Sequence, residues 1–160
     1  MRLIEASMDN WRSFREIRRR ALETDACAFG TPFKDDAAGD ADRWQKRLAE
    51  TGRHLWGIES EGRIAATLGM KMLGSRRALV FGAYTLPEFR RQGLISVLMH
   101  VALRTAKEEG ASLVVLRVNS RQKGAVSLYK KLGFHIFRVG KGEVSADGSA
   151  HTEFDMAKAL

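Results

Sequence analysis

The chain contains 160 residues, and its 27 lysines and arginines outnumber its 19 aspartates and glutamates, which gives a formal net charge of +8. This length predicts one domain over residues 1–160, and the positive charge favours an anionic partner such as a coenzyme, a nucleic acid or an acidic lipid without deciding among them. The single cysteine excludes an internal disulfide, and the absence of an apolar leader or of a run of about 20 apolar residues predicts a cytoplasmic protein without a membrane segment.

The first part of the chain predicts a strand at residues 2–6 and then a helix in which Phe14, Ile17 and Ala21 recur at helical spacing. The opposite face of this helix is rich in arginine, which predicts a surface in water. The arginines are Arg12, Arg15, Arg18 and Arg19. Residues 23–42 hold six acids against one lysine and predict a loop at 29–33, followed by a short helix that carries Trp44 and Leu48.

The middle of the chain predicts an antiparallel meander. Two apolar stretches, 55–60 and 63–72, meet at Glu61-Gly62 and read as a hairpin, and residues 79–86 read as the next strand. A long helix follows Gly93 and ends at Gly110. Its predicted apolar stripe contains Leu94, Val97, Leu98, Val101 and Thr105.

The last part predicts a parallel crossover. Residues 113–118 are apolar apart from Arg117, as expected of a strand buried on both faces, so the strand–helix–strand unit should be parallel. A shorter helix ends near Leu132, and two more strands, 134–139 and 152–157, flank a flexible loop at 140–150.

The segment from residue 79 to residue 96 is the most informative. A strand leads into Arg90-Arg91-Gln92-Gly93, and the long helix begins directly afterwards. A helix start leaves main-chain N–H groups unpaired and carries a partial positive charge, so it can hold a phosphate group. Phosphate is therefore the first ligand that this segment predicts.

This segment resembles the coenzyme loop of the GNAT superfamily of N-acetyltransferases. That loop has Gln or Arg, two free positions, Gly, one free position, and Gly or Ala; Arg90, Gly93 and Ile95 fill the three places, with Ile95 where a small residue is usual. A second resemblance lies at residues 122–134, where Leu128-Tyr129 and Gly133-Phe134 match the family pattern and Gln122 replaces its usual Asn.

The resemblance covers residues 78–135 and implies the fold of that superfamily. The expected fold is an α/β (α+β layered) domain with a central mixed, mostly antiparallel sheet of about six to seven strands, flanked by about four helices. It also implies that acetyl-CoA is the coenzyme. The implied coenzyme-binding residues are Tyr84, Thr85, Leu86, Arg90, Arg91, Gln92, Gly93, Leu94, Ile95, Ser96, Asn119, Gln122 and Tyr129.

The same resemblance implies an N-acetyltransferase that acts by direct attack of an amine in a ternary complex. Main-chain groups of Tyr84–Leu86 would pair with the pantetheine arm, and an N–H near Tyr84 would polarise the thioester. Tyr129 is implied as the general acid. Because a free tyrosine has a pKa near 10 and a thiol about 8.5, full proton transfer is uphill by about 2 kcal/mol. Tyr129 therefore either acts through a hydrogen bond that strengthens during the reaction or has a depressed pKa.

The acceptor is expected to be a small molecule or peptide with a primary amine. The family resemblance places the acidic 23–42 segment beside the acceptor pocket, and Phe29, Phe33, Asp25 and Asp35 are the predicted substrate-binding residues. Their acids motivate the hypothesis of a cationic acceptor. No Asp or Glu lies between Arg63 and Leu86, so the general base stays open among Tyr84, a water relay, Glu88 and an acid of the 23–42 segment.

Two alternatives stay open: a coenzyme-binding protein without catalysis, and a basic nucleic-acid module that uses the four helical arginines. The favoured interpretation expects no nucleic-acid partner and leaves a homodimer open. The four histidines lie far apart and lack metal-ligand spacing, so no metal is predicted.

Overall fold

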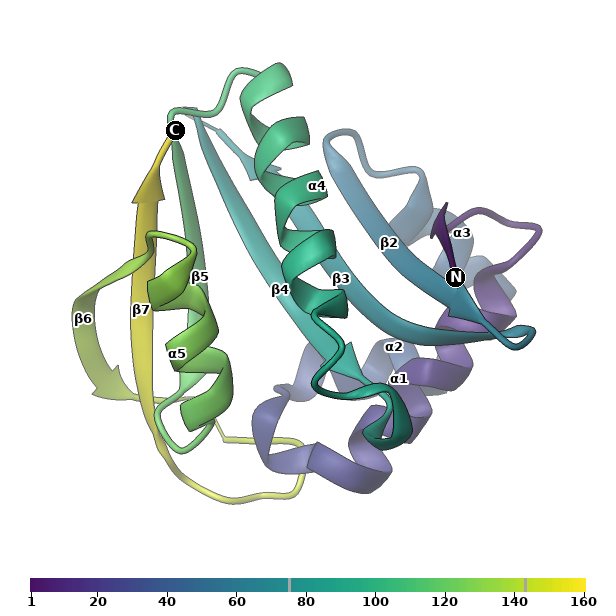
Figure 1. Cartoon of the computed structure of the whole chain (residues 1–160). Coiled ribbons are helices and arrows are strands. Elements are labelled where there is room, and N and C mark those ends of the chain that lie inside the picture. Colours follow the sequence, from purple (N-terminus) through teal and green to yellow (C-terminus); the bar gives the residue numbers. More distant parts are fainter. Residues whose placement is uncertain (75, 143) are drawn as a thin grey trace.

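The computed structural model describes residues 1–74, 76–142 and 144–160. In these residues one seven-stranded sheet has the order β1-β2-β3-β4-β5-β7-β6 (Figure 1). The strands are β1 (Arg2–Glu5), β2 (Arg53–Ser60), β3 (Arg63–Leu73), β4 (Arg77–Thr85), β5 (Leu113–Asn119), β6 (His135–Lys141) and β7 (Thr152–Ala159). The helices are α1 (Trp11–Asp25), α2 (Thr31–Ala38), α3 (Ala41–Leu48), α4 (Leu94–Glu108) and α5 (Lys123–Lys131), and short 3₁₀ turns cover Ala26–Ala28 and Pro87–Phe89.

The pairing of the strands confirms the predicted mixed sheet. β4 and β5 are parallel and are joined through α4, whereas the other paired strands are antiparallel. The expected burial of β5 on both faces holds only in part, since Val114 is fully buried while the Arg117 side chain is 49% exposed. One face of β5 borders an open cavity, which is why it tolerates a charged residue. The predicted loop at 140–150 includes residue 143, which lies outside the described residues.

Helices cover both faces of the sheet. α4 and α5 lie on one face and α1, α2 and α3 on the other (Figure 1). Under α4 the core contains Leu68, Met70, Leu98 and Met99, all fully buried. None of the described helices is long and apolar enough to cross a membrane.

The buried stripe of α4 differs from the predicted one. Val97 is 50% exposed, and the helix buries Leu94, Leu98, Met99, Ala102 and Ala106. Leu94 and Leu98 of the predicted stripe are buried as expected, and Val101 packs partly against the core, whereas Val97 does not. The two alanines let the helix backbone approach the sheet closely.

The interpretation of α1 as a solvated arginine face is wrong for Arg18. Its side chain is 4% exposed, forms an ion pair with Asp36, and lies with Cζ about 5 Å from the ring centroids of Phe33 and Trp44. Burial lowers the pKa of Arg18 to about 10, although the charge of Asp36 opposes this shift. The partner that allows this burial is 18 residues away in sequence, on a segment whose helix the sequence analysis missed.

The other three arginines of this face also have partners within the chain. The guanidinium groups of Arg12 and Arg15 lie over the Trp11 ring, and Arg15 donates to the carbonyl of Gly39 at 3.2 Å. Arg19 pairs with glutamates on its own helix. The four side chains therefore do not form a stripe of unpaired cations, which weakens the nucleic-acid alternative.

The predicted loop at 29–33 is wrong from residue 31 onward, where α2 begins. Pro32 lies in the first turn of α2, where a missing N–H costs nothing because that N–H would have no acceptor. The rings of Phe29 and Phe33 stack across this helix start with centroids 4.2 Å apart. The structure therefore has five α-helices in the described residues rather than about four.

Candidate active site

β4 and β5 separate halfway along β4. Their pairing runs from Arg77–Leu113 to Val80–Leu116 and then stops. At this point β4 contains one extra residue opposite β3, and Gly82 has a left-handed φ of 65°. Such a bulge bends and twists a strand, and Figure 1 shows the two strands diverging beyond it. Over residues 81–85 the described part of β4 has no strand partner on its β5 side.

The start of α4 offers main-chain donors without a side-chain cap. Gly93 is the N-cap, with a left-handed φ of 74°, and no side chain caps the helix. Arg91 is also left-handed, with a φ of 63°. The space beside Gly93 is open, since a Cβ at this position would meet no atom within 4 Å. The first-turn N–H groups of α4 therefore lie without a side-chain cap at the positive end of the helix, and the space beside Gly93 is open.

The side chain of Ile95 does not fill this open space. It is half-buried and packs against the hydrophobic core. Leu94 is buried as well, whereas Arg91 and Gln92 are exposed and Ser96 is partly exposed. The large residue at the small-residue position of the loop is thus accommodated by the core.

Arg90 fixes the loop to its surroundings. Its Nε donates to the carbonyl of Thr85 at 3.2 Å, and its Nη2 donates to Asp25 at 2.5 Å. Asp25, predicted to bind substrate, is therefore paired with the loop. The contacts join the end of β4, the end of α1 and the loop before α4.

Contacts of its side chain fix the position of Tyr84. It is 4% exposed, its hydroxyl lies 2.7 Å from Oγ1 of Thr24, and its ring packs edge-on against Phe29. Two neighbouring main-chain groups are also bonded, because Leu86 N–H donates to Ala65 O at 2.9 Å and the Thr85 carbonyl accepts from Arg90.

Tyr129 lies on α5 and is 6% exposed. Its ring packs edge-on against Phe134, with centroids 6.1 Å apart. Burial raises the pKa of Tyr129 to about 12, so the alternative of a depressed pKa is wrong. Full proton transfer to a thiolate would be uphill by about 5 kcal/mol. A hydroxyl in this state can donate a hydrogen bond to a developing negative charge.

Asn119 and Gln122 connect the end of β5 to the turn at Ala26–Ala28. The Asn119 amide donates to the carbonyl of Cys27 at 3.0 Å and accepts from the N–H of Arg121 at 2.9 Å. The amide nitrogen of Gln122 lies 3.9 Å from Sγ of Cys27. Asn119 is thus mostly occupied within the protein, whereas the side-chain carbonyl of Gln122 keeps its capacity to accept.

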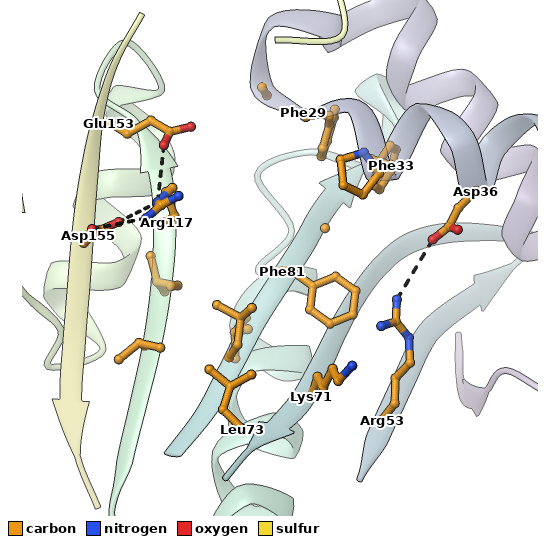
Figure 2. A pocket seen from close by; sticks show the side chains of 18 of the residues that line it. Phe29, Phe33, Asp36, Arg53, Lys71, Leu73, Phe81, Arg117, Glu153 and Asp155 are labelled. Atoms are coloured by element: carbon orange, nitrogen blue, oxygen red, sulfur yellow. Dashed lines mark hydrogen bonds and ion pairs between the residues drawn. The ribbon is translucent and has the colours of Figure 1, made fainter. Parts of the chain in front are cut away.

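A cavity of about 580 Å³ lies on the face of the sheet that carries α1, α2 and α3 (Figure 2). Phe29 and Phe33 line it, whereas Asp25 and Asp35 are not among its lining residues. Val80 and Leu116 also line it, although strand alternation turns them toward the opposite face. The cavity therefore reaches the place where β4 and β5 separate.

Several cavity residues were missed by the sequence analysis. Phe81, Arg53 and Lys71 form one wall, and Arg117, Glu153 and Asp155 form the opposite one (Figure 2). Arg117 contacts Glu153 at 3.3 Å and Asp155 at 2.7 Å. The alternation of side chains within each strand indicates which residues share a face of the sheet. That β5 and β7 lie side by side, which brings Arg117 next to Asp155, is known only from the fold. Across the described ranges, no group of His, Cys, Asp or Glu could hold a metal ion.

Comparison with known sequences gives a family match. Residues 11–134 match the acetyltransferase (GNAT) family. A curated relative, N-acetyltransferase 8 of Homo sapiens, is 32% identical over 92 residues, which cover 54% of this chain and 40% of that protein. The chain thus spans less than half the length of this relative.

Comparison with solved structures shows the same fold. An acetyltransferase of the GNAT family from Streptococcus pneumoniae superposes with a TM-score of 0.81 at 20% identity, covering 99% of this chain and 98% of that one. The yncA protein of Salmonella typhimurium, whose structure contains its cofactor acetyl-CoA, gives a TM-score of 0.82 at 18% identity and covers 100% and 94%. At these identities the likeness concerns the fold alone.

Proposed function

The chain belongs to the acetyltransferase (GNAT) family, and from this premise we propose that it transfers an acetyl group from acetyl-CoA to the primary amine of a small acceptor. The observation that carries the proposal is the separation of β4 from β5 between two sites on opposite faces of the sheet. One face presents the uncapped start of α4, and the other presents the cavity.

The residues present fit acetyl-CoA. The main-chain N–H groups of Leu94, Ile95 and Ser96 would hold the pyrophosphate, and the open space beside Gly93 allows its close approach. The unpaired edge of β4 around Gly82–Tyr84 would bond the pantetheine amides, in the manner of an added strand. Gln122 would add an amide at the end of β5.

When bound, acetyl-CoA supplies the acetyl group as a reactive thioester. Transfer forms a bond between the acceptor nitrogen and the acetyl carbon and breaks the carbon–sulfur bond. One proton leaves the amine, and one is finally taken up by the sulfur. We propose direct attack with both substrates bound, because the cavity and the helix start meet at the same gap between strands.

Tyr129 would assist the departure of the sulfur by donating a hydrogen bond from its hydroxyl. Because its pKa is about 12, it stays protonated at neutral pH and gains its largest effect when negative charge develops on the sulfur. The acceptor amine, in contrast, must lose a proton. An amine of pKa about 10.4 is mostly protonated at pH 7, a handicap of about 4.6 kcal/mol, so it must lose a proton before it attacks, and we propose that water in the cavity takes this proton up.

Thermal unfolding with and without acetyl-CoA tests the coenzyme site. A ligand held at about 100 times its Kd adds about 2.7 kcal/mol, and a domain of this size gains about 2 to 4 °C per kcal/mol, so we expect Tm to rise by about 5 to 10 °C. The rise should persist at moderate salt, because main-chain donors contribute much of the binding. An unchanged Tm at saturating acetyl-CoA would contradict the proposal.

A further inference from the structure

One wall of the cavity carries an excess of cations. Arg53 on β2 and Lys71 on β3 are paired across the two strands, so their side chains lie side by side on the same face of the sheet. Figure 2 shows both near Phe81, on the wall that faces Glu153 and Asp155. Arg47 from α3 and Arg18 from α1 complete the wall, which we call the basic wall.

The carboxylates beside the basic wall are outnumbered. Asp36 is shared by four arginines, Arg18, Arg43, Arg47 and Arg53, at distances of up to 4.0 Å. Glu50 is shared by Arg47, Arg53 and Lys71, with contacts of 3.4, 3.2 and 3.0 Å. Even when Asp35 is included as a partner of Arg43, five cations meet three carboxylates. Cations gathered in a partly buried place are unfavourable unless an anion joins them.

Arg18 adds a buried guanidinium to the basic wall. It lines the cavity, its side chain is 4% exposed, and its buried Nε has no hydrogen-bond partner among the described residues. A buried donor without an acceptor costs free energy, and native structures rarely keep one. The rings of Phe33 and Trp44 hold the guanidinium in place, so the group cannot easily turn away. Because this Nε is buried from solvent, an anion in the cavity would act on Arg18 through its charge rather than through a hydrogen bond to Nε.

The register of the sheet relates the basic wall to the gap between the strands. Lys71 is paired with Leu79, which is three residues before Gly82 on β4. At about 3.3 Å per residue this is about 10 Å, and the long Arg53 and Lys71 side chains reach over part of it. A small molecule can therefore place an amine at the gap and an anionic group at the basic wall. A cavity of about 580 Å³ suits a ligand of that size.

We infer that the acceptor is an amine that also carries an anionic group, a carboxylate or a phosphate, which Arg53 and Lys71 bind at the basic wall while the buried charge of Arg18 adds attraction. This inference rests on the proposed acetyl transfer for the fate of the amine, but not for binding of the anion. It replaces the expectation of a purely cationic acceptor, which relied on acids that are paired with arginines in the fold.

Matched pairs of amines test the inference by calorimetric titration in the presence of coenzyme A, which binds without supplying an acetyl group. The pairs are phenylalanine and phenethylamine, β-alanine and propylamine, and phosphoethanolamine and ethanolamine. In at least one pair the member that carries the anionic group, here called the anionic member, should bind about tenfold more tightly than the member that lacks this group, as expected for a charge-assisted hydrogen bond. The carboxylate and phosphate pairs show which anion is preferred.

Variants of Lys71 assign the preference to the basic wall. Lys71 is 40% exposed and forms an ion pair with Glu50 at 3.0 Å, so Lys71→Met should fold. It should raise the Kd of the anionic member about tenfold, and Lys71→Arg should restore most of the affinity. Arg104→Gln, on the exposed side of α4, is the matched control and should leave every Kd unchanged.

Equal affinity within all pairs, or no binding by any of the anionic amines, would overturn the inference. A preference that survives Lys71→Met unchanged would also overturn it. The proposed acetyl transfer is tested separately by thiol release from acetyl-CoA with the same amines. Preferred binding of an anionic amine without thiol release would therefore refute the proposed transfer and leave the anion site established.

Discussion

Replacing Tyr129 with phenylalanine should lower kcat about 100-fold while changing the Kd for acetyl-CoA less than about threefold. The variant removes only the hydroxyl, whose hydrogen bond is made mainly when charge develops on the departing sulfur. The ring keeps its packing against Phe134, so the fold should persist. Steady-state kinetics together with calorimetric titration of the coenzyme measure the two quantities.

Tyr84→Phe is the matched comparison, because Tyr84 is the other tyrosine of the chain. Its hydroxyl is hydrogen-bonded to Thr24, so this variant should lower the free energy of unfolding by about 1 kcal/mol and affect kcat much less.

The pH dependence of the wild-type rate gives a further test of Tyr129. Since the pKa of Tyr129 is about 12, the rate should rise with pH as the amine loses its proton and show no loss of acid function below about pH 10. An equal kcat for Tyr129→Phe and wild type would refute the role of the hydroxyl.

Gly93→Val should weaken acetyl-CoA binding about tenfold or more. A valine at a φ of 74° is strained by about 1 to 3 kcal/mol, and its branched side chain would occupy the open space where the pyrophosphate would lie. Titration calorimetry of the purified variant measures the affinity, and thermal unfolding measures the strain.

Gly62→Val separates these two effects. Gly62 has a φ of 73° and open space beside it, but it lies in the turn between β2 and β3, away from the start of α4. Both variants should lose similar stability, whereas Gly62→Val should keep the coenzyme affinity of the wild type. Equal affinities in the two variants would mean that the start of α4 does not bind the coenzyme.

Local sequence patterns were sufficient to predict most strands of the sheet and the loop before α4. The apolar run at 79–86, the turn at Gly93 and the helix that follows are consecutive in sequence, so their geometry depends mainly on neighbouring residues. The parallel pairing of β4 and β5 follows from the handedness of such a crossover. Gly82 inside a strand pattern was a sign of the bulge at which these strands separate, because glycine within a strand often marks one.

The cavity could not be predicted in the same way. Arg18 was predicted at the surface because it lies on an arginine-rich helix face, and its burial depends on Asp36 and two aromatic rings from other helices. Arg53 and Lys71 lie on different strands, and only the register of the hairpin places them side by side. The charge of the cavity wall depends on residues that are far apart in sequence, so it could not be predicted from any single segment.

The most direct test of acetyl transfer is the release of free thiol from acetyl-CoA by the wild-type protein, with and without each amine of the matched pairs. If the protein transfers acetyl groups, thiol release depends on the amine, and mass spectrometry detects one acetylated amine for each thiol. Thiol release at the same rate without amine, or none with any amine although acetyl-CoA raises Tm, would contradict the proposed transfer.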